Sequence, residues 1–297
     1  MSKCLIIGFG SIGERHAEVL NRLGFEINVI SKRKNLNFLT RKKIESFNLN
    51  EFEYVVISNS TENHLNTLLA VDKYFKTKAI LVEKPLSSFP SNYLPKNKVF
   101  IGYNMRFNPI IVELNKIIKS KKNLFIESRC TSYFPSWRKG NYSKSYSAKF
   151  NGGGVLRELS HELDYIKWIF GKFKFDYNIS SKLSNLNIST DDFFFGLGRI
   201  QGLSKIYFHL DYASHLEQRI LNIKSNNINL TFDFISKTIT GQVKSRTFNK
   251  KLTFDRNHSY KNMWLDIISN KGRNCCSYKD GMDTVKLIDQ LRKNKYE

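Results

Sequence analysis

The feature that most constrains the fold of this chain is a glycine-rich turn close to its first residue. A short apolar run, Leu5-Ile6-Ile7, leads into Gly8-Phe9-Gly10-Ser11-Ile12-Gly13, and helix-like sequence follows at once. In such a turn the first glycine allows the tight bend, the second lets a pyrophosphate approach, and the third lets the helix pack on the strand. The free N–H groups at the helix start then face the anion.

This order of strand, glycine turn and helix predicts a dinucleotide-binding unit. We expect the residues that cradle the pyrophosphate to be Gly8, Gly10, Ser11, Ile12 and Gly13. The alternative is a glycine-rich turn in an ordinary α/β domain that binds no ligand. The strand before the turn and the helix after it favour the dinucleotide.

Length and composition indicate a globular chain with room for two domains. It has 297 residues, of which 41% are hydrophobic, and none of its apolar runs approaches the length of a membrane span. We therefore expect no membrane partner, and the first residues lack the pattern of a secretory signal. The four cysteines, Cys4, Cys130, Cys275 and Cys276, lack metal-site spacing. These features predict a reduced, cytoplasmic protein without a metal site.

The chain is strongly basic, with a formal net charge of +22. Such a charge can serve nucleic acid or anionic small molecules. The lysines are spread along the chain, and no zinc-finger, helix-turn-helix or RNA-binding signature is visible. We therefore expect no nucleic-acid partner and favour an anionic small molecule.

Strand-like and helix-like segments alternate through the first hundred residues. The predicted strands cover residues 3–7, 25–30, 54–58, 79–82 and 99–103, and the predicted helices cover residues 12–23 and 62–74. Short apolar runs between helices are typical of a parallel sheet that is buried on both faces. The expected fold is α/β: an N-terminal Rossmann domain with a doubly wound parallel sheet, residues 1–104.

The pattern changes in the second part of the chain, residues 105–297. Helices are predicted from 109 to about 120, from 155 to about 170, at 263–268 and at 284–292; strands are predicted at 124–133, 193–200, 204–212, 217–224, 228–235 and 238–248. The spacing of these strands suits an open, mostly antiparallel sheet with helices on one face. This α+β domain is expected to bind the substrate.

A second motif, Glu83-Lys84-Pro85, follows a predicted strand. Ligands of open α/β sheets bind beyond the carboxyl ends of the strands, so Lys84 is expected to point into the cofactor crevice. The alternative is a surface lysine in a turn before proline.

A third motif combines Gly152-Gly153-Gly154 with a helix-like segment. On one continuous helix, Glu158, His161, Asp164 and Tyr165 would share a face, and a histidine beside carboxylates is a candidate general base. The alternative is a surface histidine in an ion-pair cluster. The three glycines favour a ligand nearby, because they let backbone approach it closely.

The end of the second predicted strand bears on the choice of cofactor. Ile30 is followed by Ser31, Lys32 and Arg33, with no acidic residue that would bind the ribose 2′-hydroxyl of NAD. A hydroxyl and two cations suit the 2′-phosphate of NADP. The residues therefore favour NADP, with NAD as the other possibility, and a solvated basic turn is the alternative.

Together these motifs resemble the Gfo/Idh/MocA oxidoreductase family, as does the run Gly102–Phe107, which contains Arg106. The resemblance covers most of the chain. It implies reversible hydride transfer between a nicotinamide cofactor and a secondary alcohol or ketone of a sugar, with Lys84 and His161 as catalytic residues. One of the two would take the hydroxyl proton while the other stabilises charge on the same oxygen.

The resemblance also places further residues at the cofactor: Ser58, Asn59, Thr61, His64, Glu83 and Lys84. One position departs from the family pattern. Many members have an aspartate four residues before the histidine, whereas this chain has Arg157 there, and the nearest acid is Glu158. Glu158 would have to assist His161 from another register.

The segment from residue 131 to 146 is rich in aromatic, hydroxyl and cationic side chains, which suits stacking on a sugar ring and pairing with an anion. The expected substrate-binding residues are Arg106, Tyr133, Trp137, Arg138, Tyr142, Tyr146, Glu158 and Asp164. The segment resembles the branch of the family linked to sialic-acid-like or surface-polysaccharide sugars. The alternative is a surface loop with incidental aromatic residues.

The leading hypothesis is therefore an NAD(P)-dependent enzyme acting on a nucleotide-linked or acidic sugar in surface glycan biosynthesis. The alternative is a catalytically inactive regulator of the same fold that binds cofactor or sugar. The presence of both Lys84 and His161 favours the enzyme, because a sensor needs no acid–base pair. The resemblance also suggests a homodimer or homotetramer, formed through the open sheet.

Overall fold

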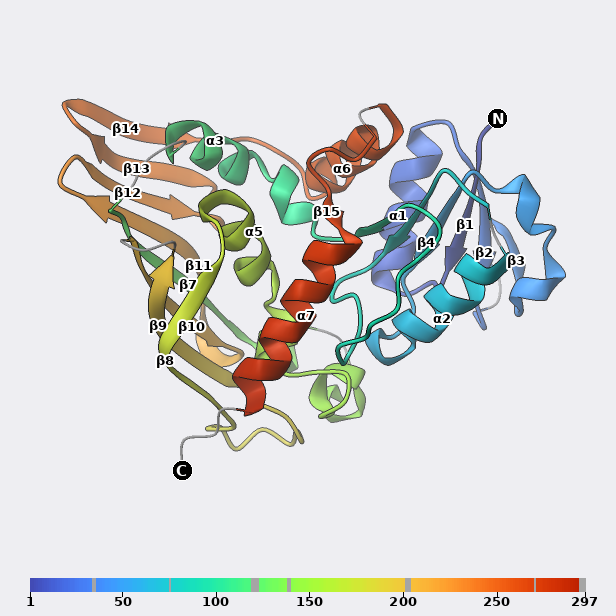
Figure 1. The fold of residues 1–297 in the computed structure, drawn as a ribbon, viewed down its shortest axis with the longest axis horizontal. Helices are drawn as coiled ribbons and strands as arrows, with labels where there is room; N and C mark the ends of the chain where they lie inside the picture. The colour runs from blue at the N-terminus through green and yellow to red at the C-terminus, as the bar shows by residue number, and fades with distance from the viewer. Residues whose placement is uncertain are drawn as a thin grey trace. The chain divides into compact units, whose positions relative to one another are not determined.

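The computed structural model describes residues 1–33, 36–74, 76–118, 123–137, 140–200, 204–269 and 271–293 (Figure 1). The chain forms two compact units. The first contains Met1–Phe107 and Arg256–Lys286, and the second contains Asn108–Asp255 and Leu287–Glu297. The boundary expected after residue 104 lies close to the first of these divisions. The return of residues 256–286 to the first unit was not predicted.

The first unit is built on a seven-stranded sheet in the order β15-β6-β5-β4-β1-β2-β3. Its strands are β1 (Lys3–Ile7), β2 (Glu26–Ile30), β3 (Leu39–Arg41), β4 (Tyr54–Ile57), β5 (Ala79–Val82), β6 (Val99–Ile101) and β15 (Cys276–Ser277). All neighbouring pairs are parallel except β15 with β6. The six parallel strands have the order of a Rossmann sheet, which confirms the predicted fold class of this part.

Helices cover both faces of this sheet, as the continuous apolar strands require. On one face, strand residues such as Ile6 and Val56 pack with α1 (Ser11–Arg22) and α6 (His258–Ser269). On the other face, alternate strand residues such as Val55 pack with α2 (Thr61–Tyr74). Successive side chains of a strand point to opposite faces, so each apolar strand contributes to both cores.

The second unit is built on an eight-stranded sheet in the order β14-β13-β12-β11-β7-β10-β9-β8. Its strands are β7 (Phe125–Tyr133), β8 (Phe173–Ser181), β9 (Phe193–Ile200), β10 (Ser204–Asp211), β11 (Ala213–Ser225), β12 (Ile228–Asp233), β13 (Thr238–Val243) and β14 (Arg246–Lys251). Among the described residues only the pairing of β10 with β7 is parallel. The predicted mostly antiparallel sheet is thus confirmed.

One face of this sheet is buried and the other is open. Phe208 and Leu221 are fully buried, whereas Tyr177 and Leu197, on outward-facing positions, are 43% exposed. The helices of the second unit are α3 (Pro109–Ile118), α4 (Val155–Glu158) and α5 (His161–Phe170). The last helix, α7 (Tyr278–Lys293), is divided between the units after Lys286.

Short 3₁₀ turns connect several of these elements. They are η1 (Ile44–Ser46), η2 (Leu49–Glu51), η3 (Asn104–Phe107), η4 (Phe134–Ser136), η5 (Tyr142–Lys144) and η6 (Tyr146–Ala148). Among the described residues, no helix combines the length and the apolar composition that crossing a membrane requires.

Two predicted elements were wrong in their continuity. The helix predicted from 155 to 170 is interrupted at Leu159 and Ser160. The backbone N–H of Glu162 donates there to the carbonyl of Leu159, three residues earlier, which tightens the turn. The strand predicted at 238–248 is a hairpin that turns at Lys244, which has a positive φ of 51°. Neither break carries the proline or the Asn-Gly pair that usually marks one in a sequence.

Candidate functional site

The glycine turn between β1 and α1 is packed against the loop that follows β4. Gly8 has a φ of +94°, and a Cβ on it would lie 2.4 Å from the backbone nitrogen of Asn59. A Cβ on Gly13 would lie 2.2 Å from the carbonyl oxygen of Gly8. The hydroxyl of Ser58 donates to the same carbonyl at 2.8 Å. The protein's own packing therefore requires glycine at positions 8 and 13.

Gly10 differs from these two glycines. Its φ is −82°, a value open to any residue, and a Cβ on it would meet none of the described atoms within 4 Å. It is the N-cap of α1, and no described side chain caps this helix start. Neither backbone geometry nor packing against the described residues explains this glycine, and the space beside the helix start is open.

His64 connects the loops that follow β4 and β5. It is buried, with its Nδ1 2.8 Å from the carbonyl oxygen of Pro85 and its Nε2 3.2 Å from that of Asn59. Burial lowers the pKa of His64, although both carbonyls favour the charged ring. We assign the proton of the neutral ring to Nδ1, because the contact with Pro85 is the shorter one. Thr61, at the start of α2, is also buried.

Glu83 leaves β5 with its carboxylate turned into the protein. Oε1 lies 2.9 Å from Nε2 of His16, and Oε2 accepts from the backbone N–H of Lys84 at 3.2 Å. A Cβ on Gly102 would lie 2.5 Å from Oε1, so glycine there makes room for the carboxylate. Glu83 thus anchors the turn that carries Lys84, which is half-buried. Sequence reasoning missed His16, which lies in the apolar face of α1 beside Ala17.

The basic segment after β2 lies at the same edge of the sheet. The backbone N–H of Arg33 donates to the hydroxyl of Ser31 at 3.0 Å, and Lys32 and Arg33 are exposed. Arg41, at the end of the neighbouring strand β3, adds a cation that sequence reasoning missed. Its guanidinium donates to the carbonyl of Ser46 and lies 4.8 Å from the ring centroid of Phe47.

In the second unit the interrupted helix separates residues that were expected on one face. Glu158 is the last residue of α4, and the half-buried His161 is the first of α5. Asp164 is fully buried. The prediction of one continuous helix is therefore wrong for Glu158, which the turn at Leu159 and Ser160 separates from the others, whereas His161, Asp164 and Tyr165 all lie in α5.

An ion pair between a buried carboxylate and a half-buried arginine, also missed by sequence reasoning, ties α5 to the sheet. The carboxylate of Glu162 lies 2.7 Å from Nε of Arg219 on β11, and the Glu162 side chain is 1% exposed. Arg219 also lies over the ring of Phe234, 5.7 Å from its centroid. This pair fixes the helix that begins with His161 against the sheet.

The aromatic segment forms a cluster around Phe134. Its ring centroid lies 5.2 Å from that of Trp137, 5.7 Å from that of Tyr142 and 4.9 Å from that of Tyr212 on the β10–β11 connection. The Tyr142 hydroxyl accepts from the backbone N–H of Asn187 at 3.1 Å. Three of the four rings come from the predicted segment, and Tyr212 was not predicted.

The remaining substrate candidates lie in different surroundings. Tyr133 stacks on His215 with ring centroids 3.9 Å apart, and Tyr146 is half-buried beside Gly152. Arg138 lies outside the described residues. Arg106 belongs to the first unit, where it is buried and donates to the carbonyl of Cys275 at 3.3 Å.

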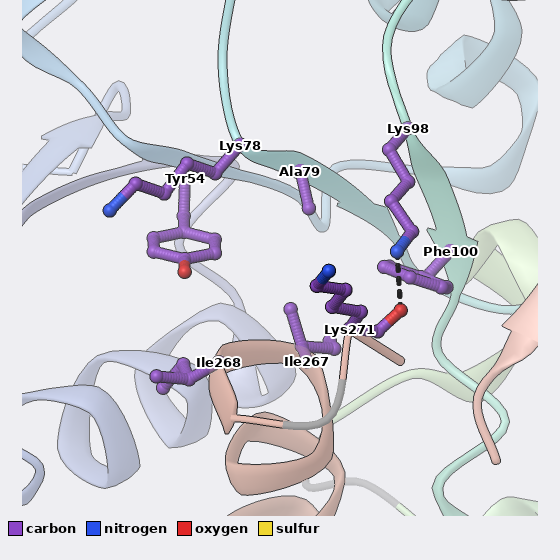
Figure 2. Close-up of a pocket in the computed structure, with 8 residues that line it drawn as sticks. All are labelled: Tyr54, Lys78, Ala79, Lys98, Phe100, Ile267, Ile268 and Lys271. Atoms are coloured by element: carbon purple, nitrogen blue, oxygen red, sulfur yellow. Dashed lines mark hydrogen bonds between the residues drawn. The ribbon is translucent and has the colours of Figure 1, made fainter. Parts of the chain in front are cut away.

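A hollow of about 300 Å³ lies at the opposite edge of the first sheet, where β4, β5 and β6 begin (Figure 2). Lys78 pairs there with Glu53, and Lys98 donates to the backbone carbonyl of Lys271. Ligands of doubly wound sheets bind at the carboxyl ends of the strands, so this hollow is not the candidate cofactor site.

No protein-family model and no curated protein sequence matches the chain. Solved structures are similar over nearly its whole length. UDP-N-acetylglucosamine 3-dehydrogenase GnnA from Acidithiobacillus ferrooxidans is 14% identical, with a TM-score of 0.78 over 99% of this chain and 97% of that chain. An oxidoreductase from Agrobacterium radiobacter, in complex with NAD+, L-tartaric acid and magnesium, is 15% identical, with a TM-score of 0.82 over 99% and 96%.

Levoglucosan dehydrogenase in complex with NADH is 12% identical, with a TM-score of 0.84 over 98% of this chain and 96% of that chain. The chain therefore shares the fold of these dehydrogenases.

We predict that Gly10→Ala weakens dinucleotide binding without destabilising the protein. The new methyl group meets no described protein atom, but it occupies the space where a pyrophosphate would approach. Gly13→Ala is the matched control, since its methyl group collides with the Gly8 carbonyl and should lower the melting temperature. Calorimetric titration with NADP and thermal unfolding measure the two effects. Unchanged cofactor affinity in Gly10→Ala would contradict pyrophosphate binding at the start of α1.

We also predict a pH-dependent contribution of His64 to stability. Its pKa is lowered in the folded protein, so below about pH 6.5 the unfolded chain binds a proton that the folded chain does not. The free energy of unfolding should therefore fall as the pH decreases from 7 to 5. His64→Asn keeps a donor toward Pro85 but cannot titrate, and should show a weaker decrease. Equal pH dependence in denaturant unfolding of both proteins would exclude this contribution.

Proposed function

We propose that the chain is an NAD(P)-dependent oxidoreductase of the Gfo/Idh/MocA type that transfers a hydride between the cofactor and a secondary alcohol or ketone of a sugar. The observation that carries this proposal is Gly10, a glycine at the start of α1 that the protein's own packing does not explain. Lys84 follows β5 at the same edge of the sheet. The dehydrogenase folds of the solved structures support the same assignment.

In the proposed complex, the N–H groups at the start of α1 bind the pyrophosphate, and Gly10 leaves room for it. Ser31, Lys32 and Arg33 bind the 2′-phosphate of NADP, with Arg41 close to them in the sheet. Ser58 and Asn59, in the loop after β4, lie along the cofactor together with Thr61 and His64, in the first turn of α2. Glu83 acts through the Lys84 turn rather than by direct contact, because its carboxylate is buried and already accepts two hydrogen bonds.

Lys84 and His161 supply the acid–base chemistry of the proposed reaction. A bound nicotinamide would accept or donate the hydride. In the direction of oxidation, one of the two side chains takes the hydroxyl proton, and the other hydrogen-bonds the same oxygen as negative charge develops. Glu158 ends α4 and His161 begins α5, so any assistance from Glu158 to His161 would act across the turn between the two helices.

The proposed substrate is a nucleotide-linked or acidic sugar in surface glycan biosynthesis. The net charge of +22 attracts anions, and the rings of Trp137 and Tyr142 provide faces for a sugar ring. One solved structure of the same fold is named for a UDP-sugar and another contains L-tartaric acid.

We further propose a homodimer or homotetramer that pairs through the open face of the second sheet. Tyr177 and Leu197 are exposed on that face, and an uncovered sheet face with apolar residues favours association. All four cysteines are free thiols, which supports a reducing, cytoplasmic setting.

We predict that Lys84→Ala lowers kcat by at least about 100-fold, the usual effect of removing an acid–base group. Cofactor affinity should stay largely intact, because the pyrophosphate cradle is untouched. The reaction is followed at the nicotinamide absorbance with a panel of nucleotide sugars. Lys78→Ala, at the opposite edge of the sheet, is the control and should turn over normally. Near-normal turnover of Lys84→Ala would reject its role, and an inactive wild type that binds both ligands would favour the regulator.

We predict that the protein binds NADP more tightly than NAD. A phosphate paired with charged donors gains about 1.5–3 kcal/mol, or roughly 10- to 100-fold in affinity. Ser31→Asp should reverse the preference, because a carboxylate accepts from the free ribose hydroxyl and repels the phosphate. Titrations with both cofactors test this, and tighter binding of NAD to the wild type would overturn it.

A further inference from the structure

We propose that His16 and Trp264 are positioning residues that hold the Lys84 backbone through the carboxylate of Glu83. The inference rests on the proposed function, because it concerns the residue assigned there to proton transfer. All four residues belong to the first unit.

A chain of three hydrogen bonds carries the proposal. The indole N–H of Trp264 donates to Nδ1 of His16 at 2.9 Å. Nε2 of His16 lies 2.9 Å from Oε1 of Glu83, and Oε2 of Glu83 accepts from the backbone N–H of Lys84 at 3.2 Å. The chain therefore leads from α6 to the turn after β5.

The direction of these bonds follows from the residue types. An indole nitrogen can only donate, so Nδ1 of His16 must accept. The single proton of the neutral imidazole is then on Nε2 and is donated to Glu83. Trp264 thus selects the tautomer that Glu83 needs, in the way a second partner fixes which ring nitrogen of a histidine carries the proton.

The three side chains of this hydrogen-bond chain are buried. His16 is 0% exposed, Trp264 is 1% exposed and Glu83 is 7% exposed. A buried carboxylate that loses a donor has little water to replace it, so it must move or recruit another group. The backbone N–H of Lys84 already donates to this carboxylate. A shift of the Glu83 carboxylate would therefore also displace the turn that carries Lys84.

The shape of the site leaves the His16 ring little freedom. Trp264 meets it edge-on with ring centroids 5.9 Å apart, and Tyr260 does so at 5.3 Å. Both come from α6, whose segment returns to the first unit after the second sheet is complete. This segment therefore covers the core and also, through His16, fixes the position of α1 relative to the turn that carries Lys84.

The test compares Trp264→Phe, His16→Leu and His16→Gln with the wild type. Trp264→Phe keeps the ring and removes only the N–H. His16→Leu removes the donor to Glu83, whereas the amide of His16→Gln can replace it. Tyr260→Phe is the matched control, because it keeps the ring contact with His16 and breaks none of the three hydrogen bonds.

We expect Trp264→Phe to lower kcat roughly 3- to 10-fold, the usual size of one neutral hydrogen bond. His16→Leu should lower kcat roughly 10- to 100-fold, as for a bond to a charged group, and His16→Gln should restore most of the loss. KM and cofactor affinity should change less than about twofold, because none of these residues contacts substrate in the proposal. Trp264→Phe should cause no further loss in the His16→Gln background, since Trp264 acts only through His16.

A second readout does not depend on activity. Amide hydrogen exchange of Lys84 in the cofactor-free protein should become faster in Trp264→Phe and His16→Leu, but not in Tyr260→Phe, because Glu83 no longer holds this N–H. An inactive wild type would count against the proposed function, while the exchange data would still decide the inference. Unchanged Lys84 exchange, or equal kcat losses from Trp264→Phe in both backgrounds, would overturn it. If His16→Leu fails to fold, the other two variants give the same decision.

Discussion

The arrangement of the turns and helix starts at the carboxyl ends of the first sheet's strands depends on how closely two backbone segments approach each other. The turn after β1 touches the loop after β4, with Gly8 against Asn59 and Gly13 against the Gly8 carbonyl. This close contact holds the start of α1 near the sheet. Gly10, the N-cap of this helix, has open space beside it. A side chain at either tight position would push the helix away, and the N–H groups at its start would no longer face the edge where Lys84 lies.

In the second unit, the short helix α5 is fixed on a largely antiparallel sheet. Gly154 has a φ of +109°, and a Cβ on it would lie 2.4 Å from the carboxylate of Asp191. Glu162 pairs with Arg219 on the sheet just after His161. Removing Arg219 would leave the buried Glu162 carboxylate without this partner, which is costly, so the pair is well suited to fixing a position.

Most of the fold could be predicted, because it follows from local patterns. The β5 bounds, 79–82, agree with the apolar run, and so do those of β9, 193–200. The predictions failed at the break at Leu159 and Ser160 and at the hairpin turn at Lys244, where no local signal exists, and they omitted the strand β8. The candidate site shows the same division. The glycines and Lys84 are visible in the sequence, whereas the partners of Glu83 are not, since His16 on its own reads as one more residue of a buried helix face.

The sequence by itself determined the order of strand, glycine turn and helix, the class of both sheets and the positions of the candidate acid–base residues. These properties depend on residues that are close in the chain. Only the tertiary structure decided that residues 256–286 return to the first unit, that Arg106 donates to the Cys275 carbonyl, and that Trp264 reaches His16. Such contacts join residues up to 248 positions apart, and the hydrogen-bonding capacity of a side chain does not reveal its partner until packing brings the two together.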